Sequence, residues 1–428
     1  MNTSRRDFLK GGLSAGAALP VLGGASLAPA WLQALQGQMN AAGKILCVVQ
    51  VRGGWDWLNL LINDHPTYYL ARPTIGIPKT STLGYINAST TVQWHPQMLP
   101  FKQLFDAGKL AVIQGIGYPS PNLSHFESEK FWYAGSPGIG LVDQGWLGGW
   151  LKKGYAGGYQ IPAIDIEGSM TPAFNGALVP VMQNPATFRF NLDAGTPADN
   201  NLALQMLVQN AMFLRPAGSS NLKYVASGIF GANNDSTVLQ STGSAYTPAV
   251  TYPNSTLSTN LRLAARYIIY GLQTQCYYMQ TGGLDNHANE VQSGSPHLGT
   301  IANIIAGITQ SVKAFLDDIK AQAPSRAQDV VVMLFSEFGR RTGENGSIGT
   351  DHGHQSMAYL AGEGVIGGLY GKYPNFSTVT TPYANHYFGW VPGQTTDFRN
   401  LYATVLEKVL SVPSAPILGA QFPLIPCF

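Results

Sequence analysis

Two short glycine-flanked runs contain the residues of this 428-residue chain that are best suited to bind a metal ion. Gly-Gly-Leu-Asp-Asn-His ends with Asp285 and His287, and Gly-Thr-Asp-His-Gly-His contains Asp351, His352 and His354. Each run alone is also compatible with a polar turn. Several carboxylates close together repel one another unless a cation neutralises them, and mixed imidazole and carboxylate ligands suit zinc, manganese or iron better than calcium. The two runs therefore predict two halves of one metal site.

A third run, Ser-Pro-Asn-Leu-Ser-His-Phe-Glu, places Ser124 directly before His125. Ser124 with Glu127 three residues later fits a capping box at the start of a helix, and the Ser124 hydroxyl also fits a nucleophile. The two roles are compatible, because the amide groups of a helix N-terminus also stabilise anions. The sequence leaves both roles open and makes Ser124 and His125 the candidate catalytic residues.

Two further carboxylates follow apolar runs. Asp56 comes shortly after residues 45–51, and Glu337 comes two residues after Phe335. A lone Asp in such a place is most often a turn or helix-cap residue. Because four apolar runs are followed by ligand-type residues, we expect Asp56 and Glu337 to be metal ligands, with Asp351 as a further one. Arg340 and His354 are candidates for binding substrate, although Arg340 also fits a surface salt bridge.

The apolar runs have the composition of buried strands. Residues 45–51, 110–117 and 330–335, and a Tyr/Met-rich run before Gly282, are short and end in glycine or polar residues. Helical periodicity occurs in residues 95–109, 261–273, 298–322 and 399–410. Alternation of strands and helices predicts an α/β fold, a doubly wound and mostly parallel sheet with helices on both faces. The carboxyl ends of parallel strands share one edge, so the candidate residues should meet there.

Residues from about 150 to 255 have a different composition, rich in Asn, Ser, Thr, Pro and Gly. This composition predicts a loop-rich insertion or cap within a single domain that spans residues 31–428. Just before it, Trp146 and Trp150 lie four residues apart. They fit either a carbohydrate platform or, more commonly, an apolar helix face.

The first thirty residues have the pattern of an export signal. Arg5-Arg6 are followed by a Gly/Ala-rich apolar run and then by Ala28-Pro29-Ala30, a small-residue cleavage site. This order predicts a twin-arginine signal peptide over residues 1–30, recognition by the twin-arginine translocase, and a periplasmic or secreted protein.

Composition limits the remaining classes of function. Charged residues make up 11% of the chain and the net charge is +2, without a basic cluster beyond the N-terminus, so nucleic-acid binding is not expected. No later stretch approaches the ~20 apolar residues of a membrane span, so none is expected in the mature chain. Cys47, Cys276 and Cys427 allow at most one disulfide, and Cys47 is expected in the core.

Several ordered blocks resemble the domain of unknown function 1501 family of exported bacterial proteins. They are VVQVRGGWDWLNLLI, GIGYPSPNLSHFES, TGGLDNH, FSEFGRRTGENGSIGTDHGH and GGLYGKYP, which together extend from about residue 45 to 410. The family looks like a distant branch of the alkaline phosphatase and sulfatase superfamily. The resemblance implies an alkaline phosphatase-like fold, one or two divalent ions, zinc or manganese foremost, and cleavage of phosphate or sulfate esters.

The resemblance also implies residue roles. Asp285, His287 and His352 look like the ligands of one metal ion. Asp56, Ser124 and Glu337 look like those of a second, with Ser124 as the nucleophile and Asp351 as a substitute ligand. His125 or His354 would protonate the leaving group.

One departure from the superfamily pattern separates two hypotheses. Ser336-Glu337-Phe338-Gly339 stands where the superfamily has Ser-Asp-His-Gly, so Phe338 replaces a ligand histidine. The first hypothesis is an exported metal-dependent hydrolase whose substrate is a small anionic ester or glycan. The second is a catalytically degenerate exported protein that binds an anion, a glycan or a protein partner. Metal content distinguishes them.

Overall fold

The computed structural model describes residues 43–428, except 139–140, 156–160, 189–205, 212 and 214–218. Residues Ala42–Phe428 form one compact unit. The predicted signal peptide, residues 1–30, lies outside the described residues, so export stays a prediction.

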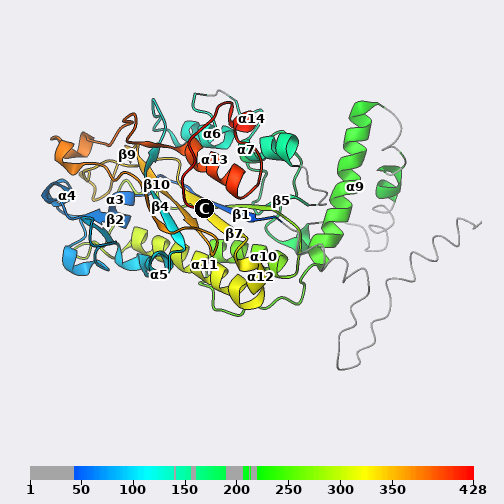
Figure 1. The fold of residues 1–428 in the computed structure, drawn as a ribbon, viewed down its shortest axis with the longest axis horizontal. Coiled ribbons are helices and arrows are strands. Elements are labelled where there is room, and N and C mark those ends of the chain that lie inside the picture. Colours follow the sequence, from blue (N-terminus) through cyan, green and yellow to red (C-terminus); the bar gives the residue numbers. More distant parts are fainter. Residues whose placement is uncertain (1–42, 139–140, 156–160, 189–205, 212, 214–218) are drawn as a thin grey trace, which may run out of the picture. The chain divides into compact units, whose positions relative to one another are not determined.

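A mostly parallel sheet is the centre of this unit (Figure 1). Within the described residues it has eight strands in the order β11-β4-β10-β7-β1-β6-β5, with β12 beside β4. Only β10 is antiparallel to its neighbours, β4 and β7. The strands are β1 (Ile45–Val51), β4 (Leu110–Gly117), β5 (Ala163–Asp165), β6 (Cys276–Thr281), β7 (Val330–Phe335), β10 (Ser356–Ala361), β11 (Gly368–Gly371) and β12 (Thr396–Asp397). The predicted α/β fold with a mostly parallel sheet is therefore confirmed.

Strand β1 shows why these residues form a central strand. All seven of its residues are buried. Cys47, Val49 and Val51 belong to one hydrophobic core, whereas Leu46 and Val48 belong to the other. Successive side chains of a strand point to opposite faces, so a continuous apolar run is stable only when both faces are covered.

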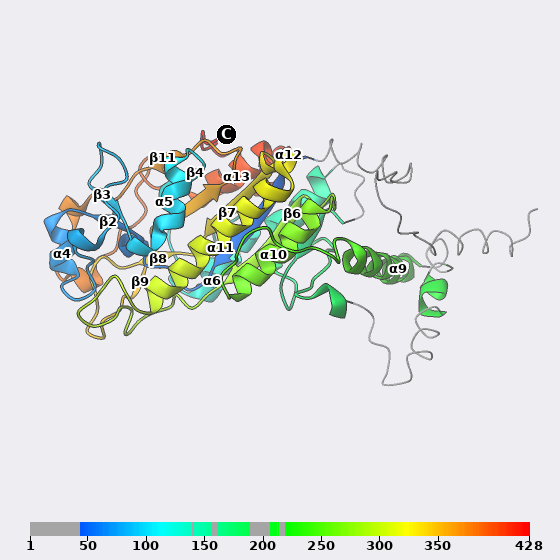
Figure 2. The same ribbon diagram turned by 90° about the horizontal axis from the view of Figure 1, so that it is seen from below.

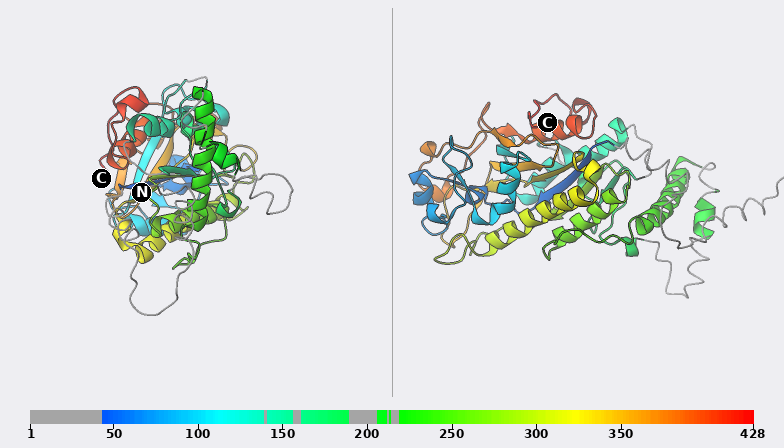
Figure 3. Two further views of the ribbon diagram at one scale, coloured as in Figure 1. Left: turned by 90° about the vertical axis from the view of Figure 1, so that its right-hand side faces the viewer. Right: turned by 60° about the horizontal axis from the view of Figure 1, so that its bottom comes forward.

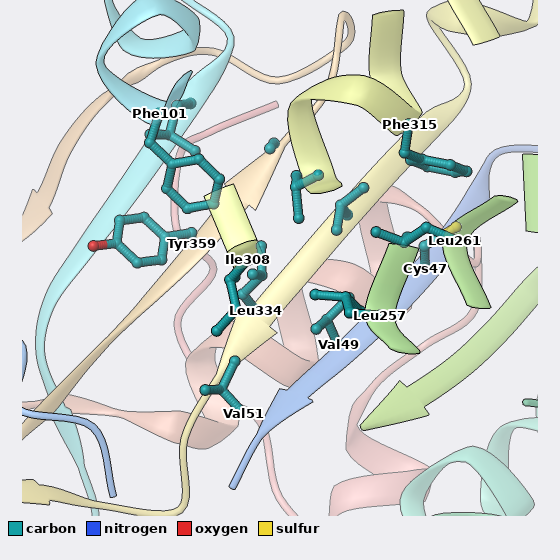
Figure 4. Close-up of a cluster of buried hydrophobic side chains, with 14 of the residues drawn as sticks. Cys47, Val49, Val51, Phe101, Leu257, Leu261, Ile308, Phe315, Leu334 and Tyr359 are labelled. Atoms are coloured by element: carbon teal, nitrogen blue, oxygen red, sulfur yellow. The ribbon is translucent and has the colours of Figure 1, made fainter. Parts of the chain in front are cut away.

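Helices cover both faces, as predicted (Figures 1 and 2). Helices α5 (Leu99–Asp106), α10 (Thr256–Ile269) and α11 (Thr300–Gln322) supply the first core. In this core Phe101 packs against Tyr359 of β10, and Leu257 and Leu261 lie near Cys47 and Val49 of β1 (Figure 4). Helices α6 (His125–Ala134), α7 (Trp146–Gly149) and α13 (Phe398–Lys408) supply the second. The right-hand view of Figure 3 shows α10 and α11 running along one face of the sheet.

Further elements complete the unit. The other α-helices of the described residues are α3 (Trp57–Leu60), α4 (Pro66–Ala71), α9 (Ser220–Ser241), α12 (Pro324–Ala327) and α14 (Ala415–Leu418). Two small antiparallel pairs are formed by β2 (Leu61–Asn63) with β3 (Val92–Trp94), and by β8 (Gly339–Arg340) with β9 (His352–Gly353).

The region from about 150 to 255 contains more regular structure than its composition suggests. It provides β5, which pairs with β6 at the edge of the sheet, and the 22-residue helix α9. The strand Ala163-Ile164-Asp165 is too short to give a periodic signal in the sequence. Trp146 and Trp150 are buried in the second core, so a carbohydrate platform at these residues is wrong.

All three cysteines lie within the described residues, are buried and form no disulfide. Cys47 lies in the core, as predicted. Across the described parts of residues 43–428, no helix is both long and apolar enough to cross a bilayer.

Candidate metal centre

The candidate ligands come together because of strand direction. Strands β4, β6 and β7 point the same way, so the residues after them, His125, Asp285 and Glu337, reach one edge of the sheet. Strand β10 runs in the opposite direction, so its amino end lies at that same edge. His352 therefore reaches the site although it precedes its strand by four residues, whereas the other three residues follow theirs.

Three imidazoles and one carboxylate converge at this edge. The ligand atoms of His125, Asp285 and His352 all lie within 4.8 Å of one another. Nε2 of His287 lies 3.0 Å from Oδ1 of Asp285 and 2.9 Å from Nε2 of His352. Nε2 of His352 is 3.1 Å from the same Oδ1. Nε2 of His125 lies 3.3 Å from Oδ2 of Asp285 but is buried without a hydrogen-bond partner.

The other ring nitrogen of each histidine contacts an oxygen atom. Nδ1 of His125 lies 2.7 Å from Oε1 of Glu337, and Nδ1 of His287 lies 3.1 Å from Oδ1 of Asp351. Nδ1 of His352 lies 2.7 Å from the carbonyl oxygen of Leu123. Carbonyl and carboxylate oxygens only accept hydrogen bonds, so each Nδ1 is the donor, and in the neutral ring each Nε2 carries its lone pair toward the cluster.

Asp285 is held from the opposite side by a buried arginine. Nη2 of Arg340 donates to Oδ1 of Asp285 at 2.6 Å. The rest of the guanidinium donates to the backbone carbonyls of Gly53, Gly54, Leu284 and Thr350. Arg340 is 2% exposed and donates to Asp285 and to four backbone carbonyls, so, contrary to its predicted role as a substrate clamp, the side chain positions Asp285.

The pKa values of the cluster follow from these contacts. Partial burial acts to raise the pKa of Asp285, but the hydrogen bond and the positive charge of Arg340 hold it well below its usual range. The hydrogen bond to Glu337 raises the pKa of His125. Burial lowers the pKa of His352, which favours its neutral, ligand-competent form.

These residues fit a divalent ion. With metal–ligand bonds of roughly 2.0–2.2 Å in a tetrahedron, neighbouring ligand atoms lie about 3.3–3.6 Å apart. The separations from Asp285 to the three histidines and from His287 to His352, between 2.9 and 3.3 Å, are close to this spacing, and the ligand atoms of His125 and His352 lie within 4.8 Å of each other. Lone pairs of His287 and His352 that face each other and a carboxylate oxygen repel one another unless a metal ion or a proton lies between them. Histidine ligands oriented by oxygen acceptors on Nδ1 are the usual outer sphere of a metal site.

Asp56 does not join this cluster, contrary to its predicted role as a metal ligand. Both of its oxygens accept from the buried guanidinium of Arg72, at 2.5 and 2.9 Å. Arg72 also donates to Asn59 and to the carbonyls of Arg341 and Thr342. A carboxylate neutralised in this way by a fixed arginine is not available as a ligand for a second ion.

Two other candidates contact the ligand histidines from behind. Glu337 is buried, and its oxygens accept from Nδ1 of His125, from the amide of Gly53 and from the hydroxyl of Ser336. Asp351 is half-exposed and accepts from Asn345 as well as His287. Both carboxylates therefore lie outside the ligand set and orient it, although the sequence predicted them as direct ligands.

Ser124 is exposed to solvent, whereas His354 is buried. Ser124 is the N-cap residue of α6, but its side chain forms no capping hydrogen bond, so the predicted capping box is not formed. Ser124 is exposed and stands between Leu123, whose carbonyl contacts His352, and His125, a member of the cluster. His354 is buried, accepts from the amide of Tyr118, and burial lowers its pKa to about 4. The predicted contact of His354 with substrate, or with a leaving group, is therefore wrong.

The sequence did not identify Arg52 as a site residue. A pocket of about 610 Å³ adjoins the cluster; His125, Asp285 and Glu337 line it, and Arg52 is its cation. Nε and Nη2 of Arg52 pair with Glu129 at 2.6 and 3.0 Å, while the side chain stays 45% exposed. The feature of the sequence that could have identified Arg52 is its position, because it follows β1 directly and so lies at the carboxyl edge of the sheet.

Comparison with known proteins gives one family match. Residues 234–410 match the family described as "Protein of unknown function (DUF1501)". The resemblance predicted from the sequence blocks is confirmed over this part, which contains Asp285, His287 and His352. The blocks around Asp56 and Ser124 lie outside the match. No curated protein matches the chain significantly.

Solved structures with a related arrangement share little sequence with this chain. PsFucS1 sulfatase from Pseudoalteromonas sp. is 12% identical, with 92% of this chain and 73% of that chain covered and a TM-score of 0.38. A protein in the alkaline phosphatase superfamily from Vibrio parahaemolyticus is 10% identical, with 88% and 69% covered and a TM-score of 0.37. The soluble domain of lipooligosaccharide phosphoethanolamine transferase A from Neisseria meningitidis is 10% identical, with 89% and 94% covered and a TM-score of 0.36. The function of the site therefore has to follow from its own residues.

Proposed function

We propose that this protein is a metal-dependent hydrolase of phosphate or sulfate esters, with Ser124 as its nucleophile. The observation that carries the proposal is the convergence of three imidazole Nε2 atoms on Asp285, each imidazole oriented through Nδ1 by an oxygen acceptor. His125, Asp285, His287 and His352 would hold the ion, and zinc or manganese suits this donor set.

The contacts around the cluster favour one ion over two. The ring of Phe338 packs against His125 and His352, with centroid separations of 4.7 and 4.8 Å. It fills the position where a further imidazole would stand. Asp56, the ligand proposed for a second ion, is neutralised by Arg72. We therefore expect a mononuclear site.

The chain's own residues supply substrate binding and the nucleophile. A divalent ion at the cluster would act as a Lewis acid on the ester oxygens. Nη1 of Arg52 forms no hydrogen bond in the described part of the chain, so it can donate to an anionic oxygen. The Ser124 hydroxyl lies at the N-terminus of α6, where backbone amides stabilise negative charge.

In the proposed reaction, Ser124 Oγ forms a bond to phosphorus or sulfur while the bridging ester oxygen leaves. The hydroxyl proton passes to solvent, and the departing alkoxide takes a proton from solvent. Water then cleaves the serine ester, releases inorganic phosphate or sulfate, and restores the hydroxyl.

The proposal extends to location. The twin-arginine signal predicted over residues 1–30 would deliver the folded protein to the periplasm or beyond through the twin-arginine translocase. That route suits a protein that acquires its metal before export. The expected substrate is a small anionic ester or the charged ester of a glycan.

Metal content of the purified full-length protein tests the proposal first. Elemental mass spectrometry is expected to find about one transition metal per chain, as one tetrahedral ligand set requires. Asp285→Ala and His352→Ala should each lose the metal. His65→Ser is the matched control, because it removes an imidazole outside the cluster and keeps a side chain able to cap α4.

Hydrolysis of 4-nitrophenyl phosphate and 4-nitrophenyl sulfate then tests the reaction. We expect the wild type to hydrolyse one of them, and Ser124→Ala to lose activity while retaining metal. A wild type that stays metal-free after incubation with zinc and manganese contradicts the hydrolase, and the degenerate binder of an anion, glycan or protein partner then replaces it.

A further inference from the structure

A second pocket lies next to the site pocket and differs from it in charge. We define the neutral pocket by its lining residues, which are Pro253, Asn254, Ser255, Thr256, Leu257, Gln280, Thr281, Gly282, Asn303, Ile304, Gly307 and Ile308, around about 530 Å³. Gln280, Thr281 and Gly282 line the site pocket as well. A ligand that occupies the site pocket can therefore extend past the end of β6 into the neutral pocket.

The neutral pocket contains no charged side chain among its lining residues. The site pocket, by contrast, is lined by Arg52, Glu129, Asp285 and Glu337. A substrate that fits both pockets has a charged end at the metal centre and an uncharged remainder. This excludes a second phosphate or sulfate group on the part that enters the neutral pocket, because nothing there would neutralise it.

Four polar side chains of the neutral pocket are available to a ligand. Asn254, Thr256 and Asn303 are exposed and form no side-chain hydrogen bond in the described part of the chain. Thr281, half-buried at the boundary between the pockets, also forms none. An amide offers two donors and an acceptor, and a hydroxyl offers one donor and an acceptor, so these side chains can pair with several hydroxyl groups at once.

Aliphatic side chains provide the remaining surface. Leu257 and Ile308 are buried and Ile304 is half-buried, so the pocket combines unpaired amides and hydroxyls with an apolar wall. A sugar ring has the same two properties: hydroxyl groups around its rim and C–H groups on its faces. An acyl chain would leave the amides unpaired, and a nucleobase would find no aromatic side chain or cation among the lining residues.

We infer that the neutral pocket is a subsite for an uncharged sugar unit, and that the substrate is a phosphate or sulfate ester of a carbohydrate. The ester group lies at the metal centre and the sugar enters the neutral pocket. This inference rests on the proposed function for the position of the ester, whereas sugar binding in the neutral pocket can be measured independently of hydrolysis.

Asn303→Leu tests the subsite in the full-length protein. The substitution removes the amide from an exposed position in the first turn of α11 and keeps a helix-forming residue of similar length. Gln310→Leu is the matched control, because Gln310 is exposed on the same helix and does not line the pocket. Both variants place one leucine on the surface of α11.

The first readout is the ratio of kcat/KM for galactose 6-sulfate and glucose 6-phosphate to kcat/KM for the corresponding 4-nitrophenyl esters. We expect this ratio to fall at least about tenfold in Asn303→Leu, which is the loss for one or two hydrogen bonds to a bound hydroxyl. Gln310→Leu should keep the wild-type ratio. An unchanged ratio in Asn303→Leu overturns the subsite.

The second readout is binding of uncharged methyl galactoside, glucoside and mannoside by saturation-transfer NMR. We expect at least one of them to bind to the wild type and to Asp285→Ala, and the signal to be lost in Asn303→Leu but not in Gln310→Leu. Binding without any ester hydrolysis supports the subsite and contradicts the proposed function. Hydrolysis of aryl esters without glycoside binding supports the function and overturns the subsite.

Discussion

Replacement of Glu337 by glutamine isolates the effect of the carboxylate behind His125. In the wild type, Oε1 accepts from the amide of Gly53 at 2.8 Å and lies 2.7 Å from Nδ1 of His125, while Oε2 accepts from the hydroxyl of Ser336 at 2.9 Å. A glutamine has the same shape. Its carbonyl oxygen can take the place of Oε1, and its amide group can donate to the Ser336 hydroxyl after that hydroxyl rotates. The variant therefore removes one charge and leaves the local packing intact.

We expect the loss of the Glu337 charge to weaken metal binding. Partners of a ligand histidine contribute to ligand basicity, and their replacement typically weakens metal binding by about 10- to 100-fold, or roughly 1.4–2.7 kcal/mol. Zinc affinity is measured by competition with a fluorescent chelator at fixed pH. We expect Glu337→Gln to raise the Kd for zinc by this factor while the thermal midpoint of the metal-free protein changes little.

Glu344→Gln is the control for this experiment. Glu344 also accepts backbone hydrogen bonds, from Thr74 and Ile75, but contacts none of the four proposed ligands. Its substitution should leave the Kd for zinc unchanged. If Glu337→Gln binds zinc within about threefold of wild type, whereas Asp285→Ala loses zinc, Nδ1 of His125 does not set the affinity of the site and the outer-sphere argument fails.

Three further outcomes follow from buried charges and backbone geometry. Arg72→Met leaves the buried carboxylate of Asp56 without its cation and should lower the free energy of unfolding by about 3–5 kcal/mol in urea titrations; a loss below 1 kcal/mol would contradict the buried pair. Burial raises the pKa of Asp165 from 3.8 to about 7, a difference worth roughly 4 kcal/mol. This stabilisation is complete below the unfolded-state pKa of 3.8 and is lost as pH rises through about 7. Thermal midpoints should therefore fall between these two pH values in the wild type, and should depend less on pH in Asp165→Asn. Gly54 has φ +63°, and a Cβ there would overlap the ring of Phe338, so Gly54→Ala should destabilise by at least about 1 kcal/mol in urea titrations, whereas Gly84→Ala, at a positive φ in open space, should cost less.

Strand position was predictable from sequence because it depends on local composition. The runs that end at Val51, Gly117 and Phe335 are buried on both faces, and β-branched and apolar residues bounded by glycine are typical of such strands. The convergence of Asp285, His287 and His352 was predictable for a related reason. Once the strands are taken as parallel, the residues after them must share an edge.

The partners of buried charges were not predictable. Asp56 has the sequence context of a metal ligand, and only the fold brings Arg72 against it. Arg340 has the context of a surface cation, and only the fold encloses it among four backbone carbonyls. Long-range pairing of this kind has no periodicity, because it depends on which loops cross at the edge of the sheet.

Backbone pairing of the two glycine-flanked runs has a consequence for the metal-free protein. The amide of Thr350 donates to the carbonyl of Asn286, and the amides of Asn289 and Glu290 donate to the carbonyls of Ser347 and Ile348. These bonds connect the run that contains Asp285 and His287 to the run that contains Asp351 and His352. Because they involve no ligand atom, removal of the metal should leave the runs in register. The three ligands on these runs are therefore in place before the ion binds, and the affinity of the site should depend mainly on the charge and tautomer of its side chains rather than on the cost of ordering two loops.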